Sequence, residues 1–426
     1  MGFGLVRCFL TALWLSKARL VAEYCAAFSA QVNGKPRATN RKSFCKEFMS
    51  VGKTKGVRIL GIESSCDETA AAVVVDGCRI LSSVVASQID IHRKYGGVVP
   101  ELASREHLRQ IVPVVREALA DAGLRFDEVD AIGVTQGPGL VGSLLVGITY
   151  GKTLAEALGK PLLAVNHLEG HVHAALLQAR QDGGTPELPA VSLIVSGGHT
   201  VLYEVRATSE NGSPTLRYRK LGQTRDDAAG EAYDKVAKLL GLGYPGGPVL
   251  DRLAAAADAL PAPVKFGPTR TRGNALDFSF SGLKTAVLYH LREHPEYDGE
   301  IREREEALAQ GRRKFDELLS LCSPATLGLV REFQNAVVRD LVERTLAAAE
   351  ETGVGNILVS GGVAANSQLR ATLLGRTRER GLKIYLPSRE LSTDNAAMIA
   401  AAAYARYLGG VFADSSLNAV ANMPLA

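Results

Sequence analysis

The sequence predicts an α/β protein with two related lobes and a ligand cleft between them. Three segments share one pattern, a short apolar run followed by a turn of small polar residues, at 58–65, 192–199 and 357–362. Each pattern indicates a buried strand whose end leaves backbone N–H groups free to hold an anion. Glycine pairs at two of these turns let the main chain approach a phosphate, because glycine has no Cβ. Three such turns indicate a duplicated nucleotide-binding fold, and 426 residues are enough for two cores.

The first half of the chain is expected to alternate strands with helices. A strand pair is predicted at 70–75 and 80–87, because Asp76-Gly77 is a hairpin signal. A helix is expected to begin at Pro100 and end near Asp121, since Pro and an acidic residue suit a first helical turn. The remaining elements are expected to be strands at 131–135 and 162–165 and a helix at about 141–158.

The second half is predicted to be mainly helical. Helices are expected near 226–241, 248–258, 281–293, 331–352 and 394–408, with a loop at 242–248. Charges of both signs crowd residues 292–317, which indicates a solvated helical insertion within about 292–330. We therefore assign residues 57–165 to lobe I, completed by an alanine-rich helix within about 394–420, and residues 166–393 to lobe II.

Residues 1–56 form a basic N-terminal extension that we expect to be unstructured. It carries ten Lys/Arg and two acidic residues, so the rest of the chain holds 39 basic and 43 acidic residues. Bulk charge therefore does not predict a nucleic-acid partner, and any basic surface must be local. The extension is typical of an organellar transit peptide, or of translated sequence ahead of a start near Met49. We favour the second interpretation.

Composition favours a cytoplasmic location for the rest of the chain. Six cysteines show no CxxC spacing, which indicates reduced thiols and no disulfide framework. No apolar run reaches the roughly 20 residues needed to span a bilayer, so no membrane partner is expected.

His167 and His171 are the most informative residues. Two imidazoles four positions apart lie on one face of a helix, a spacing that suits a divalent metal. They follow the predicted strand at 162–165, where ligand clefts open in α/β proteins. Asp394, far along the chain, can close such a site from the opposite wall. The alternative is a polar helix start in which one histidine caps the helix and the other is solvated.

Glu169 argues against a zinc peptidase. In the HExxH motif the glutamate directly follows the first histidine and serves as the general base. Here Glu169 lies two residues after His167, roughly 200° around the helix, so it points away from the metal. A peptidase is therefore disfavoured on geometry.

Four charged residues recur at helical spacing in lobe II. Asp227, Glu231, Asp234 and Lys235 can present carboxylates to a ribose, or they can form exposed i,i+4 pairs. The rigid, Gly-rich stretch 244–248 that follows favours ligand binding.

Two further turns carry polar side chains. Residues 360–366 run from a strand into a helix, and Asn366 offers both a donor and an acceptor to a nucleoside. The turn at 64–68 holds Asp67 and Glu68, which can organise a phosphate or an ion, or only cap the turn.

Eight stretches carry a resemblance to one family. They are 61–69, 96–105, 167–171, 195–200, 226–235, 278–284, 360–366 and 393–395. In this order they closely resemble the bacterial tRNA N6-adenosine threonylcarbamoyltransferases, a universal family once labelled O-sialoglycoprotein endopeptidases. The resemblance covers residues 57–426 apart from parts of 292–330.

The resemblance implies a two-lobed fold of the actin, sugar-kinase and Hsp70 type, which is a duplicated RNase H-like fold. It implies transfer of threonylcarbamoyl from threonylcarbamoyl-AMP to N6 of adenosine 37, in tRNAs reading codons that begin with A, with release of AMP. It implies one metal ion, Fe2+ or alternatively Zn2+, on His167, His171 and Asp394. The residues implied for donor binding are Ile194, Val195, Ser196, Gly197, Gly198, Asp234, Gly247, Asp251 and Asn366.

Other roles are less directly indicated. Asp67 and Glu68 are our candidates for accepting the N6 proton. Besides tRNA, the resemblance implies a smaller paralogue of similar fold and a P-loop ATPase as partners. The ending 418–426 lacks the basic and aromatic residues of many relatives, which argues against RNA contacts from that end. A metal-dependent glycoprotein endopeptidase and a nucleotide-driven ATPase like actin or Hsp70 stay open as alternatives.

Overall fold

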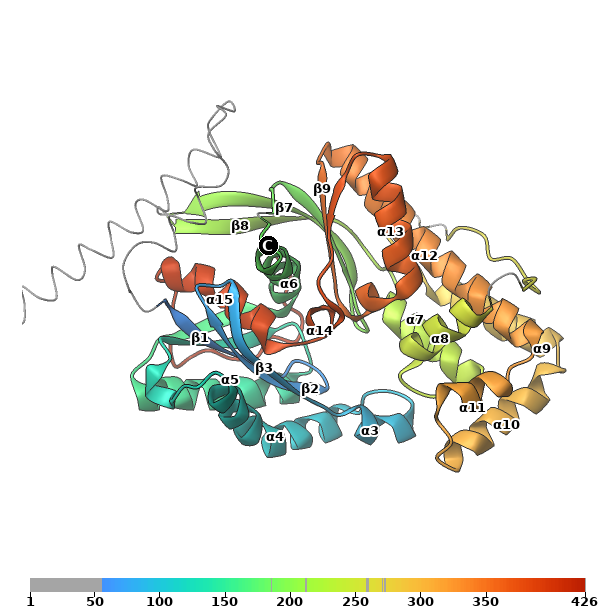
Figure 1. Cartoon of the computed structure of the whole chain (residues 1–426), viewed down its shortest axis with the longest axis horizontal. Coiled ribbons are helices and arrows are strands. Elements are labelled where there is room, and N and C mark those ends of the chain that lie inside the picture. The colour runs from blue at the N-terminus through green and yellow to red at the C-terminus, as the bar shows by residue number, and fades with distance from the viewer. Residues whose placement is uncertain are drawn as a thin grey trace, which may run out of the picture.

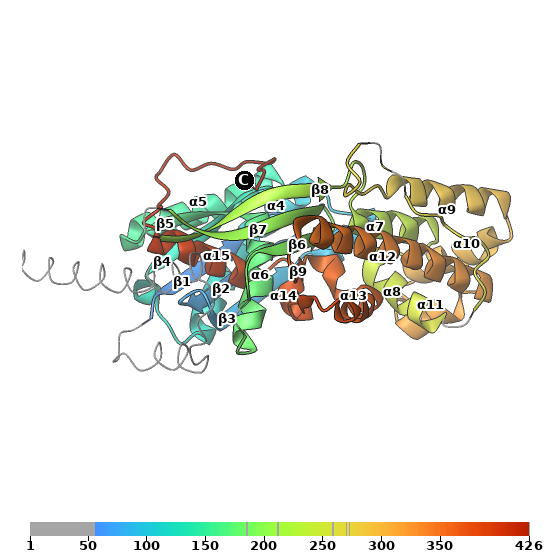
Figure 2. The same ribbon diagram turned by 90° about the horizontal axis from the view of Figure 1, so that it is seen from above.

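The computed structural model describes residues 56–184, 186–210, 213–257, 260–269, 271 and 273–425. Except for Gly56, the predicted N-terminal extension lies outside the described residues. The described chain forms two five-stranded sheets, each packed against helices (Figures 1 and 2).

Both sheets repeat one topology. The first contains β1 (Arg58–Glu63), β2 (Glu68–Val75), β3 (Arg79–Ser87), β4 (Ala131–Gly137) and β5 (Leu162–Asn166). The second contains β6 (Ala190–Val195), β7 (Thr200–Glu210), β8 (Ser213–Gln223), β9 (Asn356–Ser360) and β10 (Lys383–Tyr385). Their orders are β3-β2-β1-β4-β5 and β8-β7-β6-β9-β10. In each, the first three strands along the chain are antiparallel, and the last two run parallel to the first. This repetition confirms the predicted duplicated, RNase H-like fold.

Helices connect the strands and cover the sheets. The longer ones are α4 (Pro100–Asp121), α5 (Val141–Leu158), α6 (His167–Gln181), α7 (Ala229–Leu239), α8 (Gly246–Ala256), α9 (Ser281–Glu293), α10 (Tyr297–Ala309), α12 (Pro324–Thr352), α13 (Ser367–Glu379) and α15 (Ala396–Leu408). The shorter ones are α3 (Ile89–His92), α11 (Phe315–Ser320), α14 (Arg389–Ser392) and three 3-10 turns, Arg93–Tyr95, Phe126–Glu128 and Gly362–Ala365.

The helices divide the apolar core into layers. Buried side chains of α4 and α5 pack on one face of the first sheet, and those of α6 and α15 pack on the other. Helix α6 also contributes to a cluster on the second sheet, whose opposite face is covered by α7, α8 and α12. Helix α6 therefore lies between the two sheets, as Figure 1 shows.

Glycines let α15 approach its neighbours closely. A Cβ at Gly61 in β1 would lie 2.3 Å from the carbonyl oxygen of Ala396, and one at Gly170 in α6 would lie 2.9 Å from Ile399 Cδ1. Only glycine fits at position 61, where the close atom is backbone, whereas a side chain at position 170 would have to displace the end of Ile399. This packing confirms that the last helix crosses back onto the first sheet. It also brings the residues just before α15 next to the start of α6.

Three expectations for the second half were wrong in detail. Helix α12 begins at Pro324, seven residues earlier than predicted, because Ser323 caps it through a bond from the Thr326 amide. Helix α8 begins inside the expected loop, at Gly246. The charged segment is not fully solvated, because Arg304 is completely buried and donates to the Leu240 carbonyl at 2.8 Å.

The C-terminal segment returns across both lobes. Ala413 forms a bridge with Leu162 at the edge of β5, and Gly139 donates to the carbonyl of Ala421. The buried Leu425 then joins the cluster between α6 and the second sheet. Among the helices that the structure describes, none has both the length and the apolar character required to cross a bilayer.

Candidate metal centre and ligand cleft

His167, His171 and Asp394 converge where α6 meets the segment before α15. One ligand atom from each lies within 4.8 Å of the other two. Both histidine Nε2 atoms face Asp394 Oδ1, at 3.6 Å from His167 and 3.3 Å from His171. The two imidazoles share a helix face, as their spacing predicted, and the distant aspartate faces them.

Local sequence explains how the triad is positioned. The Asn166 side chain caps α6 by accepting from the Leu168 amide at 2.9 Å, which starts the helix directly after β5. Asn395 caps α15 in the same way, accepting from the Met398 amide. Both histidines lie in the first turns of a capped helix, and Asp394 directly precedes another.

Glu63 orients the His167 ring through a hydrogen bond at Nδ1. The Nδ1 atom of His167 lies 3.0 Å from Glu63 Oε2, which also accepts from the Thr135 hydroxyl at 2.8 Å. A proton on Nδ1 leaves Nε2 free to bind a metal. Burial lowers the pKa of His167, but the charges of Glu63 and Asp394 outweigh it and raise that pKa to about 9.

The buried polar atoms of this cluster fit a cation. His171 is fully buried; within the described part of the chain its Nδ1 has no hydrogen-bond partner, and its Nε2 faces Asp394 Oδ1 at 3.3 Å without the geometry of a hydrogen bond. Burial lowers its pKa, so the ring is neutral and can act as a ligand. Two imidazole nitrogens and a carboxylate oxygen form a ligand set suited to Fe2+ or Zn2+, provided that the ion displaces the Nε2 proton of His167.

Glu169 points away from the triad, as predicted. It is buried and pairs with Arg406, whose Nη2 lies 2.7 Å from Glu169 Oε2. A carboxylate held in this pair cannot act as the general base of a zinc peptidase.

The predicted donor-binding turn lies at the end of β6. Ile194 and Val195 are buried strand residues, and Ser196 closes the turn, because its amide donates to the His199 carbonyl at 2.7 Å. Gly197 and Gly198 are exposed, and a Cβ at either would meet no atom within 4 Å. The main chain is therefore open to a ligand here.

Asp234 and Gly247 lie together at the junction of α7 and α8. Asp234 Oδ1 accepts from the amide of Gly246 at 2.7 Å. Burial, and then repulsion from Asp67, raises the pKa of Asp234 to about 6, although the amides of Gly246 and Gly247 oppose the shift. Space beside Gly247 is open, since a Cβ there would meet no atom within 4 Å.

Asp251 and Asn366 belong to one buried network centred on Gln334. Gln334 donates to Asp251 Oδ1 at 3.1 Å and accepts from Asn366 Nδ2 at 2.9 Å. Asp251 also accepts from the amide and the hydroxyl of Ser367, at 3.0 and 2.9 Å. Their side chains are therefore fixed by protein contacts, which orients them without a ligand.

Asp67 and Glu68 belong to the first lobe, where Glu68 is the first residue of β2 and Asp67 directly precedes it. Burial, the charge of Asp67 and the charge of Asp394 hold the pKa of Glu68 well above its usual range. The charge of Asp67 in turn raises the pKa of Asp234. Asp67 and Glu68 therefore act electrostatically on both the metal triad and the lobe II residues.

Sequence reasoning assigned no role to Glu63, His199 or Gln334. A carboxylate at the end of the apolar strand 58–63 was a usable signal for Glu63, because a buried charge requires a partner. His199 followed a glycine pair that was already selected, and its ring centroid lies 6.3 Å from that of His167. Gln334 stands within a long helix and gave no local signal.

The family model and the curated relatives name the same family. The family model for tRNA N6-adenosine threonylcarbamoyltransferase matches residues 79–401. A curated protein of that name from Koribacter versatilis is 55% identical over 380 residues, covering 86% of this chain and 98% of its own length. One from Moorella thermoacetica is 51% identical, covering 86% of this chain and 97% of its own. Among solved structures, full-length HypF in its phosphate- and nucleotide-bound form is 12% identical with a TM-score of 0.47, covering 85% of this chain and 57% of that one.

Proposed function

This chain belongs to the tRNA N6-adenosine threonylcarbamoyltransferase family, and we propose that it modifies adenosine 37 of tRNAs that read codons beginning with A. The donor is threonylcarbamoyl-AMP, and the products are the modified tRNA and AMP. The observation that carries this proposal is the family match over most of the chain. The polar residues gathered in the cleft support it.

In this reaction the main task of the protein is to orient the donor and the adenine amine. The N6 amine attacks the carbamoyl carbon and forms a C–N bond, while the bond from that carbon to the phosphate oxygen breaks. AMP leaves with the electron pair, and one N6 proton passes to a base or to water. Because the adenine amine is a poor nucleophile, positioning and charge stabilisation supply much of the rate. Asp67 and Glu68 are our candidates for the proton acceptor, and Glu68 can serve only in its ionised form, because burial raises the pKa of its carboxyl.

We assign one divalent metal, Fe2+ with Zn2+ as the alternative, to His167, His171 and Asp394. When bound, it supplies Lewis-acid polarisation of the threonylcarbamoyl group. Glu63 accepts a hydrogen bond from Nδ1–H of His167, so that Nε2 of this ring faces Asp394. The ligand set and the lack, within the described residues, of a hydrogen bond to either ring nitrogen of His171 support this assignment.

For the donor we propose the cradle from Ile194 to Gly198, completed by Asp234, Gly247, Asp251 and Asn366. The open main chain at Gly197 and Gly198 suits a phosphate, because free amides bind anions there. An ionised Asp234 can accept a hydrogen bond from a ribose hydroxyl.

Adenosine binding should therefore depend on pH through Asp234. With a pKa of about 6, the carboxylate of Asp234 becomes protonated as the pH falls. The protonated carboxyl is a weaker acceptor of the hydrogen bond from the ribose hydroxyl. We expect affinity for adenosine to drop about 10-fold between pH 7 and pH 5, measured by calorimetry. Adenosine is the probe because it lacks the titrating phosphate of AMP. Asp234→Asn should bind with a flat profile, and an unchanged slope in that variant would show that another group titrates.

We propose a smaller paralogue and a P-loop ATPase as partners. The surface of α4 and α5 supports the paralogue, because it exposes four apolar side chains, Leu108, Val112, Val141 and Leu145. A paralogue of similar fold would present an equivalent helix pair, and two helix pairs bury such side chains by packing together.

Charged substitutions on that surface should weaken the binding of this chain to the paralogue. Leu108→Asp combined with Leu145→Asp is expected to weaken paralogue binding at least about 10-fold, because each places a charge in an apolar interface. Analytical ultracentrifugation of the mixed proteins measures the effect. Leu374→Asp on α13 is the matched control, since Leu374 is also an exposed leucine. Equal weakening by the control would contradict the assignment.

The most direct test is reconstitution. The full chain, with both partners, donor and unmodified tRNA, should yield threonylcarbamoyladenosine at position 37, detected by mass spectrometry of nucleosides. Failure with active partners would overturn the proposed function. We place this reaction in the cytoplasm, which is supported by Cys66, Cys78 and Cys322, because none of them forms a disulfide within the described residues.

A further inference from the structure

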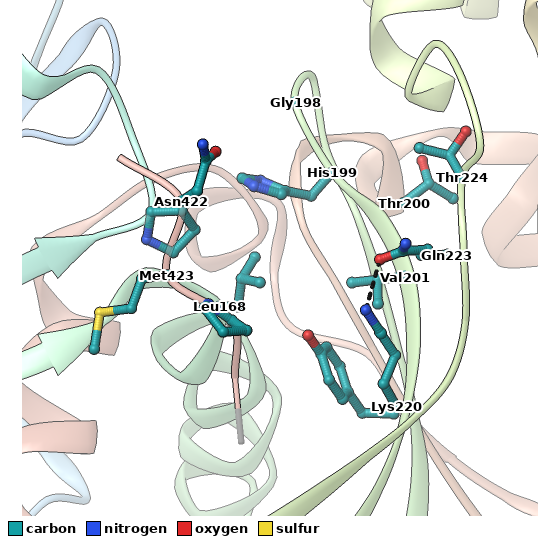
Figure 3. A pocket seen from close by; sticks show the side chains of 13 residues that line it. Leu168, Gly198, His199, Thr200, Val201, Lys220, Gln223, Thr224, Asn422 and Met423 are labelled. Atoms are coloured by element: carbon teal, nitrogen blue, oxygen red, sulfur yellow. Dashed lines mark hydrogen bonds between the residues drawn. The ribbon is translucent and has the colours of Figure 1, made fainter. Parts of the chain in front are cut away.

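A cavity lies beside the C-terminal segment, with Leu168, the residue after the metal ligand His167, in its lining. It has a volume of about 290 Å³ and is lined by residues of the β6–β7 turn, of β7 and β8, and of the chain end at 422–424. Gly198 and His199 form part of its wall, so it begins where the proposed donor cradle ends. Figure 3 shows the His199 ring directed toward Asn422 at one end of this cavity.

The chain end forms a firmly held wall. Asn166 Nδ2 donates to the carbonyls of Met423 and Pro424, at 3.2 and 3.3 Å. The same side chain caps α6, the helix that carries the metal histidines. The side-chain amide of Asn166 therefore fixes both the start of α6 and the wall of the cavity. It holds the cavity wall at a constant position relative to the histidines of α6.

The lining suits a purine base. Asn422 is exposed, and Gln223 lies across the cavity with Lys220 donating to its Oε1 at 2.9 Å. A side-chain amide can pair with the amine and ring nitrogen of adenine at once, and the half-buried ring of His199 offers a surface for stacking. The lining also includes the hydroxyl-bearing Thr200 and Thr224, so polar groups are available on several sides of a bound base.

The adjoining strand carries the local basic surface that bulk charge did not predict. Lys220 on β8 is exposed at the cavity, while Arg217 and Arg219 on β8 and Arg206 on β7 are exposed on the opposite face of this edge strand pair, because successive side chains of a strand alternate in direction. Glu204, between them, pairs with both Arg206 and Arg219, which leaves the strip positive in sum. Such a strip suits RNA phosphates.

Resting on the proposed function, we propose that this cavity receives the acceptor adenine, turned out of the anticodon loop, while β7 and β8 contact the RNA backbone. The His199 ring lies 6.3 Å from that of His167, so a base held here can present its amine to a donor at the triad. The chain end takes part through an amide and a rigid main chain. Its lack of charged and aromatic residues therefore does not exclude it from RNA contact.

Kinetics of the reconstituted complex test this proposal. Asn422→Ala and Gln223→Ala should each raise the KM for tRNA about 10-fold, with the KM for the donor unchanged. Asn418→Ala is the matched control, since Asn418 is an exposed asparagine of the same segment outside the cavity and should behave as wild type. Binding to an anticodon stem-loop with 2-aminopurine at position 37 should increase its fluorescence, and the double variant should lose that increase.

Each outcome bears on a separate claim. Unchanged tRNA KM and fluorescence in the two variants would overturn the cavity assignment while the proposed function stands. A donor KM that rises as much as the tRNA KM would also overturn it, because the cavity would then belong to the donor. A wild-type complex that leaves tRNA unmodified would overturn the proposed function itself, and this inference with it.

Discussion

Replacing both His167 and His171 by alanine is expected to reduce tRNA modification by roughly 1,000-fold and to remove the bound metal. Two of the three ligand side chains disappear, and Asp394 alone offers one carboxylate to an ion. Nucleoside mass spectrometry measures the rate, and elemental analysis of the purified chain measures the metal content.

His173→Leu is the matched control for that experiment. His173 lies on the same helix and is buried, but it is outside the triad. Burial lowers its pKa to about 3, so it carries no charge at neutral pH. Leucine fills a similar volume, and we expect one metal per chain and near-normal activity. Full activity in the double histidine variant, with the same fold by circular dichroism, would refute the metal assignment.

Glu63→Gln is expected to weaken metal binding about 10- to 100-fold without altering the ligand set. The carboxylate of Glu63 accepts a hydrogen bond from Nδ1–H of His167, and its negative charge makes the ring a stronger base. Glutamine keeps the shape and can still bond to Thr135 and Ser65, but it removes the negative charge. Titration against a chelator of known affinity measures the change.

Added metal should rescue this variant. At saturating metal the rate should recover most of its wild-type value, because His167, His171 and Asp394 remain. Glu204→Gln provides the comparison, since Glu204 is also a buried, paired glutamate but lies in the second sheet. If Glu63→Gln bound metal as tightly as wild type, Glu63 would have no role in orienting the ligand.

Local sequence predicted most of the elements of the fold. The helices α4 and α5 begin and end where expected, because proline, glycine and apolar periodicity mark them clearly. The start of α12 was missed because its signal is a serine cap followed by proline, which a turn also contains. The burial of Arg304 could not be predicted, since its partners are carbonyls from distant segments.

The residues of the candidate site likewise fall into those that the sequence predicted and those that it could not predict. The histidine spacing places His167 and His171 correctly, since i and i+4 share a helix face whatever surrounds them. The partners that hold them could not be derived from spacing. Glu63, the Gln334 network and the cavity at the chain end depend on tertiary contacts between residues about 30 to over 200 positions apart.

The place of Asp394 in the chain has a consequence for biosynthesis. Lobe I has all its strands once residue 166 is made, and both histidines follow within five residues. The carboxylate that completes the triad leaves the ribosome only after the second sheet has been translated. A polypeptide released early therefore lacks the ligand that closes the ion site, so truncated products should carry little iron or zinc.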